Sequence, residues 1–134
     1  KTCFDAVGGY DADLSIWEDI DLIIRLYGPG RFIHLPKPLY RHRLYGHNAS
    51  RNIPSLRALD GRRRFLDKHA ASCRPGTPEG DALSHDWAIY YADLGKHHLR
   101  ANTPTAARQA FQSALRHDPY NVKTWSRLVR SYFV

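Results

Sequence analysis

The sequence predicts an α/β segment followed by an all-α helix-turn-helix repeat, in a chain of 134 residues. The first observation is that residues 1–57 combine glycine-rich turns, one amphipathic helix and short β-like runs. The second is that residues 82–134 show helical spacing throughout and repeat themselves at a fixed interval. A hydrophobic share of 43% supplies enough apolar side chains for a core, and no apolar run approaches the length of a membrane span.

The first predicted helix begins after Ser15, in the stretch SIWEDIDLIIRLYG. Glu18 follows three residues later, which is the spacing of a capping box. The run Gly28-Pro29-Gly30 ends the helix, because neither residue type continues a helix readily. The apolar side chains recur at helical spacing and are expected to face a core; they are Ile16, Ile20, Ile23, Ile24 and Tyr27.

Two extended runs follow this helix and are predicted to be strands. The first is RFIHL, residues 31–35, which Pro36 and Pro38 close. The second is LYRHRLY, residues 39–45. A helix followed by two strands indicates α/β architecture for residues 1–57.

Residues 58–81 are predicted to connect two domains through a helix and a linker. Gly61 interrupts the helix, and the linker SCRPGTPEGD is rich in proline and glycine, so we place the domain boundary there. The run Arg62–Arg64 adds to a net charge of +7, which suits contact with phosphates. A solvated helix face explains such a run without a ligand, and no nucleic-acid-binding pattern accompanies it. Nucleic acid is therefore not expected as a partner.

Residues 82–134 are predicted to be all helical, with a repeat of 34 residues. Thr103-Pro104 supplies a cap and a first-turn proline for one helix, and Asp118-Pro119 ends it. Three pairs of positions mark the repeat: Tyr91 with Trp125, Leu94 with Leu128, and His98 with Tyr132.

This spacing resembles that of the tetratricopeptide repeat, whose small and large positions are matched by Gly95, Ala107, Phe111, Ala114 and Pro119. His98 stands where that family usually has Tyr, and Val129 stands where it usually has Gly. The resemblance implies a protein partner, or self-association, through the helical repeat. Tyr91, His98 and Arg100 are candidates for lining a peptide groove, and packing between helices is the alternative.

Three carboxylates, Glu18, Asp19 and Asp21, open the first predicted helix. Helix capping, or attraction to the positive end of the helix dipole, is enough to explain the position of each carboxylate taken alone. Asp21 also has the spacing for an ion pair with Arg25. The flanking Trp17 is large and apolar, and partial desolvation raises the proton affinity of a neighbouring carboxylate toward that of a general base. The residues alone leave both interpretations open.

Residues 4–50 resemble the C-terminal third of a family 2 glycosyltransferase domain of the GT-A fold. The resemblance lies in an ordered series of motifs: Gly8-Gly9-Tyr10-Asp11, Glu18-Asp19-Ile20-Asp21, Pro36-Lys37-Pro38-Leu39, Tyr40-Arg41 and Gly46-His47-Asn48-Ala49-Ser50. It implies inverting transfer of a sugar from a nucleotide-diphospho-sugar to an acceptor hydroxyl. In this interpretation residues 1–57 are the C-terminal portion of the catalytic domain, residues 58–81 a helix and linker, and residues 82–134 a tetratricopeptide-like region.

The resemblance also implies roles for individual residues. Asp19 is the general base, and Glu18 is its neighbour for acceptor contact and capping. Tyr45 stands where many members have a histidine, and His47 is the candidate to replace it. The residues expected to contact the acceptor or the diphosphate are Trp17, Arg41, Arg43, Tyr45 and His47.

The implied partners are a nucleotide-sugar donor and a glycan or lipid-linked acceptor, in the cytoplasm or at the cytoplasmic face of the membrane. A divalent metal, Mg or Mn, is expected in the full-length enzyme, with ligands mainly outside this chain; none is assigned here. The chain is expected to be an excerpt that lacks the donor-binding half and is inactive alone. The alternative function is a non-catalytic tetratricopeptide-type protein-binding module with a degenerate transferase remnant.

Overall fold

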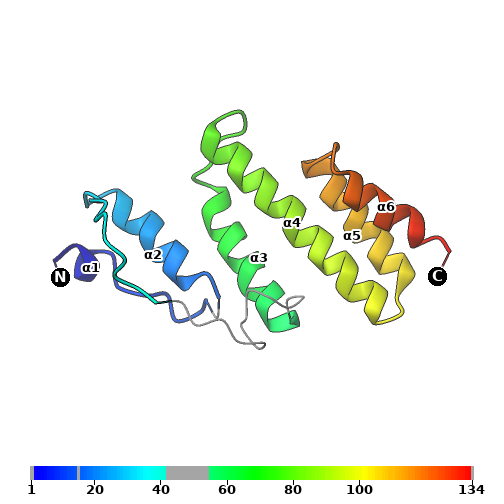
Figure 1. Cartoon of the computed structure of the whole chain (residues 1–134), viewed down its shortest axis with the longest axis horizontal. Coiled ribbons are helices and arrows are strands. Elements are labelled where there is room, and N and C mark those ends of the chain that lie inside the picture. The colour runs from blue at the N-terminus through cyan, green and yellow to red at the C-terminus, as the bar shows by residue number, and fades with distance from the viewer. Residues whose placement is uncertain (1, 15, 42–54, 134) are drawn as a thin grey trace. The chain divides into compact units, whose positions relative to one another are not determined.

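The structure is a computed structural model that describes residues 2–14, 16–41 and 55–133. The helices are α1 (Thr2–Ala6), α2 (Glu18–Tyr27), α3 (Leu56–Ala70), α4 (Pro78–Arg100), α5 (Pro104–His117) and α6 (Val122–Arg130), as labelled in Figure 1. The chain divides into two compact units, Lys1–Asn52 and Ile53–Val134, which we describe separately.

The predicted α/β segment is wrong, because the described residues contain helices and no strand. RFIHL and the described start of the second run, residues 39–41, form no ladder, and the remainder of that run lies outside the described residues. A strand is stable only when a neighbouring strand pairs with its backbone groups. The side chains of RFIHL also lack a covering layer, since Ile33 is 83% exposed. The local sequence favours extended backbone here, but pairing and burial are missing.

The capping box predicted for α2 is also wrong. The helix begins at Glu18, and Trp17 takes the N-cap position without a side-chain cap hydrogen bond. Ser15 lies outside the described residues. The carboxylates of Glu18, Asp19 and Asp21 still fall in the first turn, where the helix dipole favours negative charge.

The expected core face of α2 is largely exposed within the described structure. Ile20, Ile23 and Ile24 are each more than two-fifths exposed, whereas Leu22 and Asp21 are buried. The periodicity correctly indicated a helix. It did not identify the buried side, because the side that a helix buries depends on its neighbours.

The second unit is a row of antiparallel helices in which α3 contacts α4, α4 contacts α5, and α5 contacts α6 (Figure 1). Local signals set the helix starts: Ser55 Oγ accepts from Ala58 N, Thr77 Oγ1 from Gly80 N, and Asn121 Oδ1 from Thr124 N. The helix α3 runs through Gly61 without a break, and the turn after it joins α3 to α4 inside this unit.

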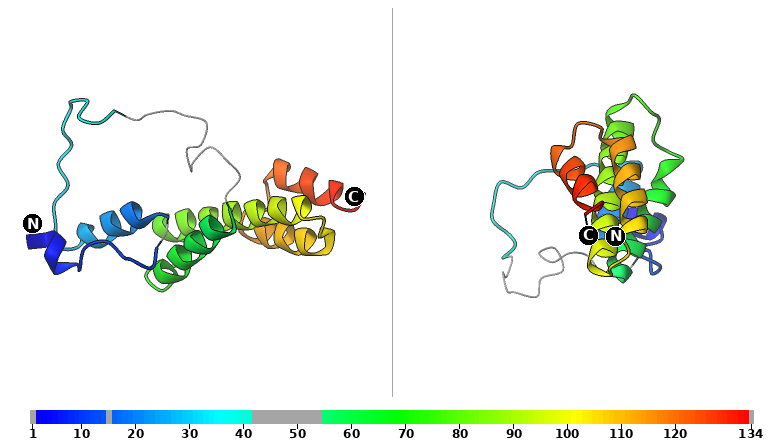
Figure 2. Two further views of the ribbon diagram at one scale, coloured as in Figure 1. Left: turned by 90° about the horizontal axis from the view of Figure 1, so that it is seen from below. Right: turned by 90° about the vertical axis from the view of Figure 1, so that its right-hand side faces the viewer.

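The core of the second unit lies where α4, α5 and α6 meet. It consists of Ala107, Phe111, Leu115 and Leu128, with Leu99 packed against it. Figure 2 shows α5 and α6 side by side, consistent with their shared core residues. The opposite edge of the unit is held by Arg62 of α3, whose guanidinium pairs with Asp86 and Asp93 of α4.

Within the described ranges, none of the helices combines the length and the apolar character that crossing a lipid bilayer requires. Cys3 and Cys73 both carry free thiols.

Candidate functional site

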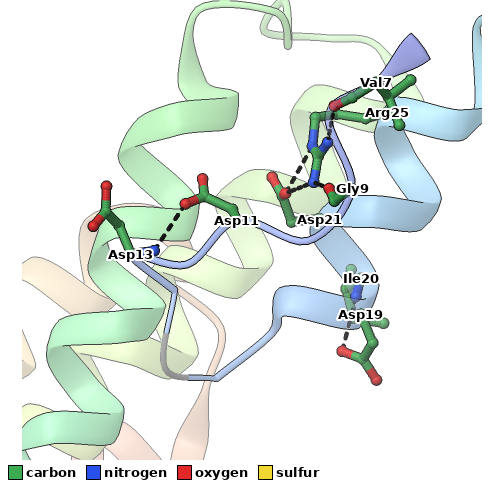
Figure 3. A network of polar contacts seen from close by, with 8 residues as sticks. All are labelled: Val7, Gly9, Asp11, Asp13, Asp19, Ile20, Asp21 and Arg25. Carbon is green, nitrogen blue, oxygen red and sulfur yellow. Dashed lines mark hydrogen bonds and ion pairs between the residues drawn. The ribbon is translucent and has the colours of Figure 1, made fainter. Parts of the chain in front are cut away.

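The buried carboxylate of the acidic turn is Asp21, and its partner is Arg25 one helical turn later. Their ion pair measures 2.7 Å between Asp21 Oδ2 and Arg25 Nη2, and the Asp21 side chain is fully buried. The same guanidinium donates to the backbone carbonyls of Val7 and Gly9 (Figure 3). Asp21 and Arg25 therefore fasten the glycine-rich loop to α2, which is a structural role.

The predicted base, Asp19, has different surroundings. It is exposed, and its Oδ1 accepts a hydrogen bond of 2.8 Å from the backbone of Ile20. Figure 3 shows its carboxylate turned away from the Arg25 guanidinium. Glu18 is half-buried beside it. The structure thus places Asp19 where a solute could reach it.

Trp17 adopts an unusual backbone conformation at the start of the acidic turn. Its φ of 70° and ψ of 13° lie in the left-handed region, which bulky residues rarely enter. Such a conformation costs roughly 1–3 kcal/mol unless the surroundings compensate for it. Of the two described residues that the sequence predicted for acceptor or diphosphate contact, Trp17 and Arg41, Trp17 has this distinctive backbone geometry.

Of the other residues predicted for these contacts, the structure describes Arg41. Arg41 is exposed at the end of a described segment. Arg43, Tyr45 and His47 lie outside the described residues. No group of three His, Cys, Asp or Glu side chains in the described ranges could hold a metal ion, so the residues there do not form a site for the expected Mg or Mn. That metal stays a prediction.

A second candidate site lies on α6, which has apolar side chains on two sides. On one side Leu128 is buried in the core with residues of α5, and the polar Thr124 is also buried. A separate row recurs at helical spacing and remains exposed. We call this row the α6 stripe; it consists of Val122 (78% exposed), Trp125 (50%) and Val129 (56%) of α6, and of Tyr132 (57%) in the turn that follows.

Both aromatic rings of the α6 stripe are held in place by hydrogen bonds or charge. Trp125 donates its indole N–H to the carbonyl of Pro119 at 2.8 Å. The guanidinium of Arg108, on α5, lies 4.4 Å from the centre of the Tyr132 ring and donates to the carbonyl of Ser131. The rings are therefore positioned before any partner arrives.

A basic row lies on a different side of α6 from the stripe. Lys123, Arg127 and Arg130 recur at the spacing of one helix face. In the described part of the chain none of the three forms an ion pair. At about 100° per residue, the centre of this row lies roughly 145° around α6 from the centre of the stripe. The apolar and the cationic sides of α6 are therefore separate surfaces.

The sequence analysis identified Trp125 and Tyr132 as markers of a repeat but did not recognise the α6 stripe. The signal was present, because Val122, Trp125 and Val129 are large apolar residues at helical spacing beside Leu128. Tyr91 and His98, which were candidates for a groove, instead contact α5: Tyr91 stacks on His117, and His98 Nδ1 lies 3.1 Å from Thr103 Oγ1. These contacts of Tyr91 and His98 fit the alternative interpretation, which is packing between helices.

No family model, curated protein or solved structure matches this chain. The resemblance to family 2 glycosyltransferases followed by a tetratricopeptide-like repeat is therefore wrong as an assignment of the family. The described residues form helices alone, whereas the GT-A fold requires a sheet, and no family match supports either half of the assignment.

Proposed function

We propose that the chain is a non-catalytic protein-binding module whose helical unit presents the α6 stripe to a partner protein. The observation that carries the proposal is the two-sided apolar character of α6. One side places Leu128 in the core with α5, and the other is apolar and open to solvent. Exposed apolar residues scattered singly need no explanation, but a contiguous row with aromatic anchors is typical of an interaction site.

The physical chemistry of the α6 stripe supports binding. Fully burying one large apolar side chain contributes about 1.5–3 kcal/mol. Each flexible side chain that becomes ordered on association reduces the binding free energy by about 0.5–1.5 kcal/mol. Trp125 and Tyr132 are already held by Pro119 and Arg108, so less of the binding energy is lost in ordering them.

Sugar transfer with Asp19 as base, a nucleotide-sugar donor and a glycan or lipid-linked acceptor stays a prediction. No observed geometry around Asp19 favours it over protein binding. A cytoplasmic location belongs to our proposal, and the free thiols of Cys3 and Cys73 support it, because reducing compartments keep cysteines unpaired.

The proposal is tested by selecting displayed peptides for binding to the immobilised full chain. A library that includes helix-forming and extended peptides makes no assumption about the form of the partner. We expect enriched peptides to lose binding when the chain carries Val129→Asp, because a carboxylate in the centre of the α6 stripe would be desolvated on binding.

The matched control is Gln112→Asp, which adds the same charge at an exposed position of α5. Both variants should keep the far-UV circular dichroism of the parent chain, because both positions are exposed. The proposed function would be overturned if no selected peptide bound the Gln112→Asp variant more tightly than the Val129→Asp variant.

A further inference from the structure

The positive charge of the chain is concentrated in residues 94–134. After Asp93 the sequence contains seven Lys or Arg residues and a single acidic residue, Asp118. The whole chain has a net charge of +7, so residues 1–93 are nearly neutral. Asp118 accepts a hydrogen bond of 3.0 Å from the side chain of Asn121, and among the described residues it forms no ion pair. Such an uneven distribution of charge indicates a surface that meets an anionic partner.

The basic residues of α3 and of α6 differ in how their charge is balanced. Each of the three consecutive arginines of α3 faces a carboxylate: Arg62 pairs with Asp86 and Asp93, Arg63 with Asp67, and Arg64 with Asp60. The basic row of α6 has no such partner in the described ranges, and α6 itself contains no Asp or Glu. The chain therefore neutralises the arginines of α3 internally and leaves the basic row open to an anion from outside.

The placement of the basic row partly opposes the stability of α6. Lys123 and Arg127 are four residues apart and Arg127 and Arg130 are three apart, so neighbouring like charges repel each other. The helix dipole favours Arg127 and Arg130 in the last turn, but it disfavours Lys123, which is the second residue of the helix. Helix stability therefore does not explain why all three positions are basic. An anion bound across the row would relieve the repulsion.

The surroundings of the basic row narrow the class of anion. At about 100° per residue, its three side chains fall within roughly 60° of the circumference of α6, and Ser126 and Thr124 border them on the same helix. No aromatic side chain of α6 lies in this arc, so the row lacks the platform on which single-stranded nucleic acid stacks its bases. The arc also lacks an apolar side chain of α6 that could enter a lipid bilayer, since the α6 stripe lies on a different side.

The basic row is also short. Lys123 and Arg130 are seven positions apart, so the row is about 10 Å long at a rise of about 1.5 Å per residue. Duplex nucleic acid and anionic bilayers are held by many charge contacts at once, which three side chains do not supply. An extended peptide crosses the same distance in about three residues. The size of the row therefore favours a short acidic peptide segment.

We infer that the basic row binds a short acidic segment of a partner protein, in which a few aspartate or glutamate residues lie together. The guanidinium groups of Arg127 and Arg130 can each hold a carboxylate through two parallel hydrogen bonds, and Lys123 adds a compact positive charge. The inference goes beyond the proposed function, because it concerns a second surface of α6 and does not use the α6 stripe.

The test uses the full chain and two fluorescently labelled peptides of about 12 residues, which are longer than the basic row when extended. The first has a run of glutamates flanked by glycine and serine, and the second has glutamine in place of each glutamate. Fluorescence anisotropy at low salt should give roughly tenfold higher affinity for the glutamate peptide, because several ion pairs form together. The difference should shrink as salt is raised.

Two double variants separate the basic row from net charge. Lys123→Gln/Arg130→Gln removes two cations of the row and should weaken binding of the glutamate peptide about fivefold. Arg63→Gln/Arg64→Gln changes the net charge by the same amount on α3 and should keep the parent affinity within about twofold. All four positions are exposed, so both variants should keep the far-UV circular dichroism of the parent chain.

Equal affinity for the glutamate and glutamine peptides would overturn the inference. An equal loss in the two double variants would assign the binding to net charge and would also overturn it. A DNA oligonucleotide, single-stranded or duplex, and vesicles that contain phosphatidylserine are measured beside the peptides. If either bound through the basic row more than about tenfold more tightly than the glutamate peptide, the partner would carry phosphates and the inference would fail.

Two further outcomes are distinguishable from these. Self-association of the chain that Lys123→Gln/Arg130→Gln abolishes would identify a second copy as the occupant, against the inference. If the glutamate peptide fails to bind while the peptide library yields binders that depend on Val129, this inference fails and the proposed function stands. If the glutamate peptide binds through the basic row and no library peptide depends on Val129, the reverse holds.

Discussion

The ring of Phe111, on α5, lies against the backbone of Gly95, so that no side chain of α4 separates the ring from the α4 backbone at that point. A Cβ atom at position 95 would lie 2.5 Å from Cε1 and 2.7 Å from Cδ1 of the ring. Phe111 is fully buried and is surrounded by Ala107, Leu115 and Leu128. The ring therefore has little room to move aside.

Gly95→Ala should destabilise the second unit. Alanine favours helix over glycine by about 1 kcal/mol, but forcing a methyl group into a packed core costs roughly 1–3 kcal/mol. Because the added carbon would lie only 2.5 Å from the ring, we expect the overpacking to prevail, with a net loss of up to about 2 kcal/mol and a lower urea midpoint by far-UV circular dichroism. Gly28→Ala is the control, because nothing lies within 4 Å of the added carbon. An unchanged midpoint for Gly95→Ala would mean that α4 and α5 are less tightly packed than described.

Arg62→Met should destabilise the contact between α3 and α4. Arg62 is buried, and its Nη2 and Nη1 lie 3.3 Å from Asp86 Oδ1 and 3.7 Å from Asp93 Oδ2. Removing one partner of a buried pair leaves carboxylates without compensation. We expect a loss of roughly 2 kcal/mol in the free energy of unfolding, below the usual 3–5 kcal/mol because Lys96 still pairs with Asp93.

The neighbouring arginines provide a matched control for Arg62. Arg63 and Arg64 are exposed and form ion pairs one turn away, with Asp67 and Asp60. Arg63→Met and Arg64→Met should change the free energy of unfolding by less than about 0.5 kcal/mol, as is usual for exposed pairs. A similar loss in all three variants would point to the helix propensity or solubility of α3 rather than to the buried pair.

The helices of the second unit could be predicted from the sequence because their signals are local. The caps at Ser55, Thr77 and Asn121 act within one turn, and the prolines Pro78 and Pro104 lie in the first turn of their helices. The prediction of a strand at residues 31–35 was wrong, because a strand needs a pairing partner that is distant in the sequence, and local signals do not show whether one is present. The sequence also could not show which of the three consecutive arginines is buried. The burial of Arg62 depends on Asp86 and Asp93, which lie on a different helix.

Asp21→Asn should loosen the first unit, whereas Asp19→Asn should not. Asp21 is buried and paired with Arg25, whose guanidinium also binds the carbonyls of Val7 and Gly9. Losing the charge should cost about 2–3 kcal/mol locally. Asp19 is exposed, and its loss should cost less than about 1 kcal/mol through the helix dipole.

Amide hydrogen exchange measures this difference within one unit. Exchange at residues 7–9 and in α2 should accelerate in Asp21→Asn and stay near the parent rate in Asp19→Asn. Equal acceleration in both variants would mean that the acidic turn acts as one charge cluster. The sequence indicated the Asp21–Arg25 spacing, but it could not show that Asp21 is the buried carboxylate and Asp19 the open one, because that depends on the loop that Arg25 holds.

The stability of the second unit should fall as the pH drops below about 6.5, through His117. Its ring is stacked against Trp87 and Tyr91, and burial lowers the pKa of His117 below the usual 6.5. The unfolded chain therefore takes up a proton at a higher pH than the folded chain. The contribution of neutral His117 to stability is complete above pH 6.5 and is lost as the pH falls toward the folded pKa.

Urea midpoints measured between about pH 5.5 and 7.5 should fall toward acid pH in the parent chain and fall less in His117→Gln. His85→Gln, at an exposed position of α4, is the control and should keep the parent's slope. If His117→Gln kept it too, another group would be responsible for the pH dependence.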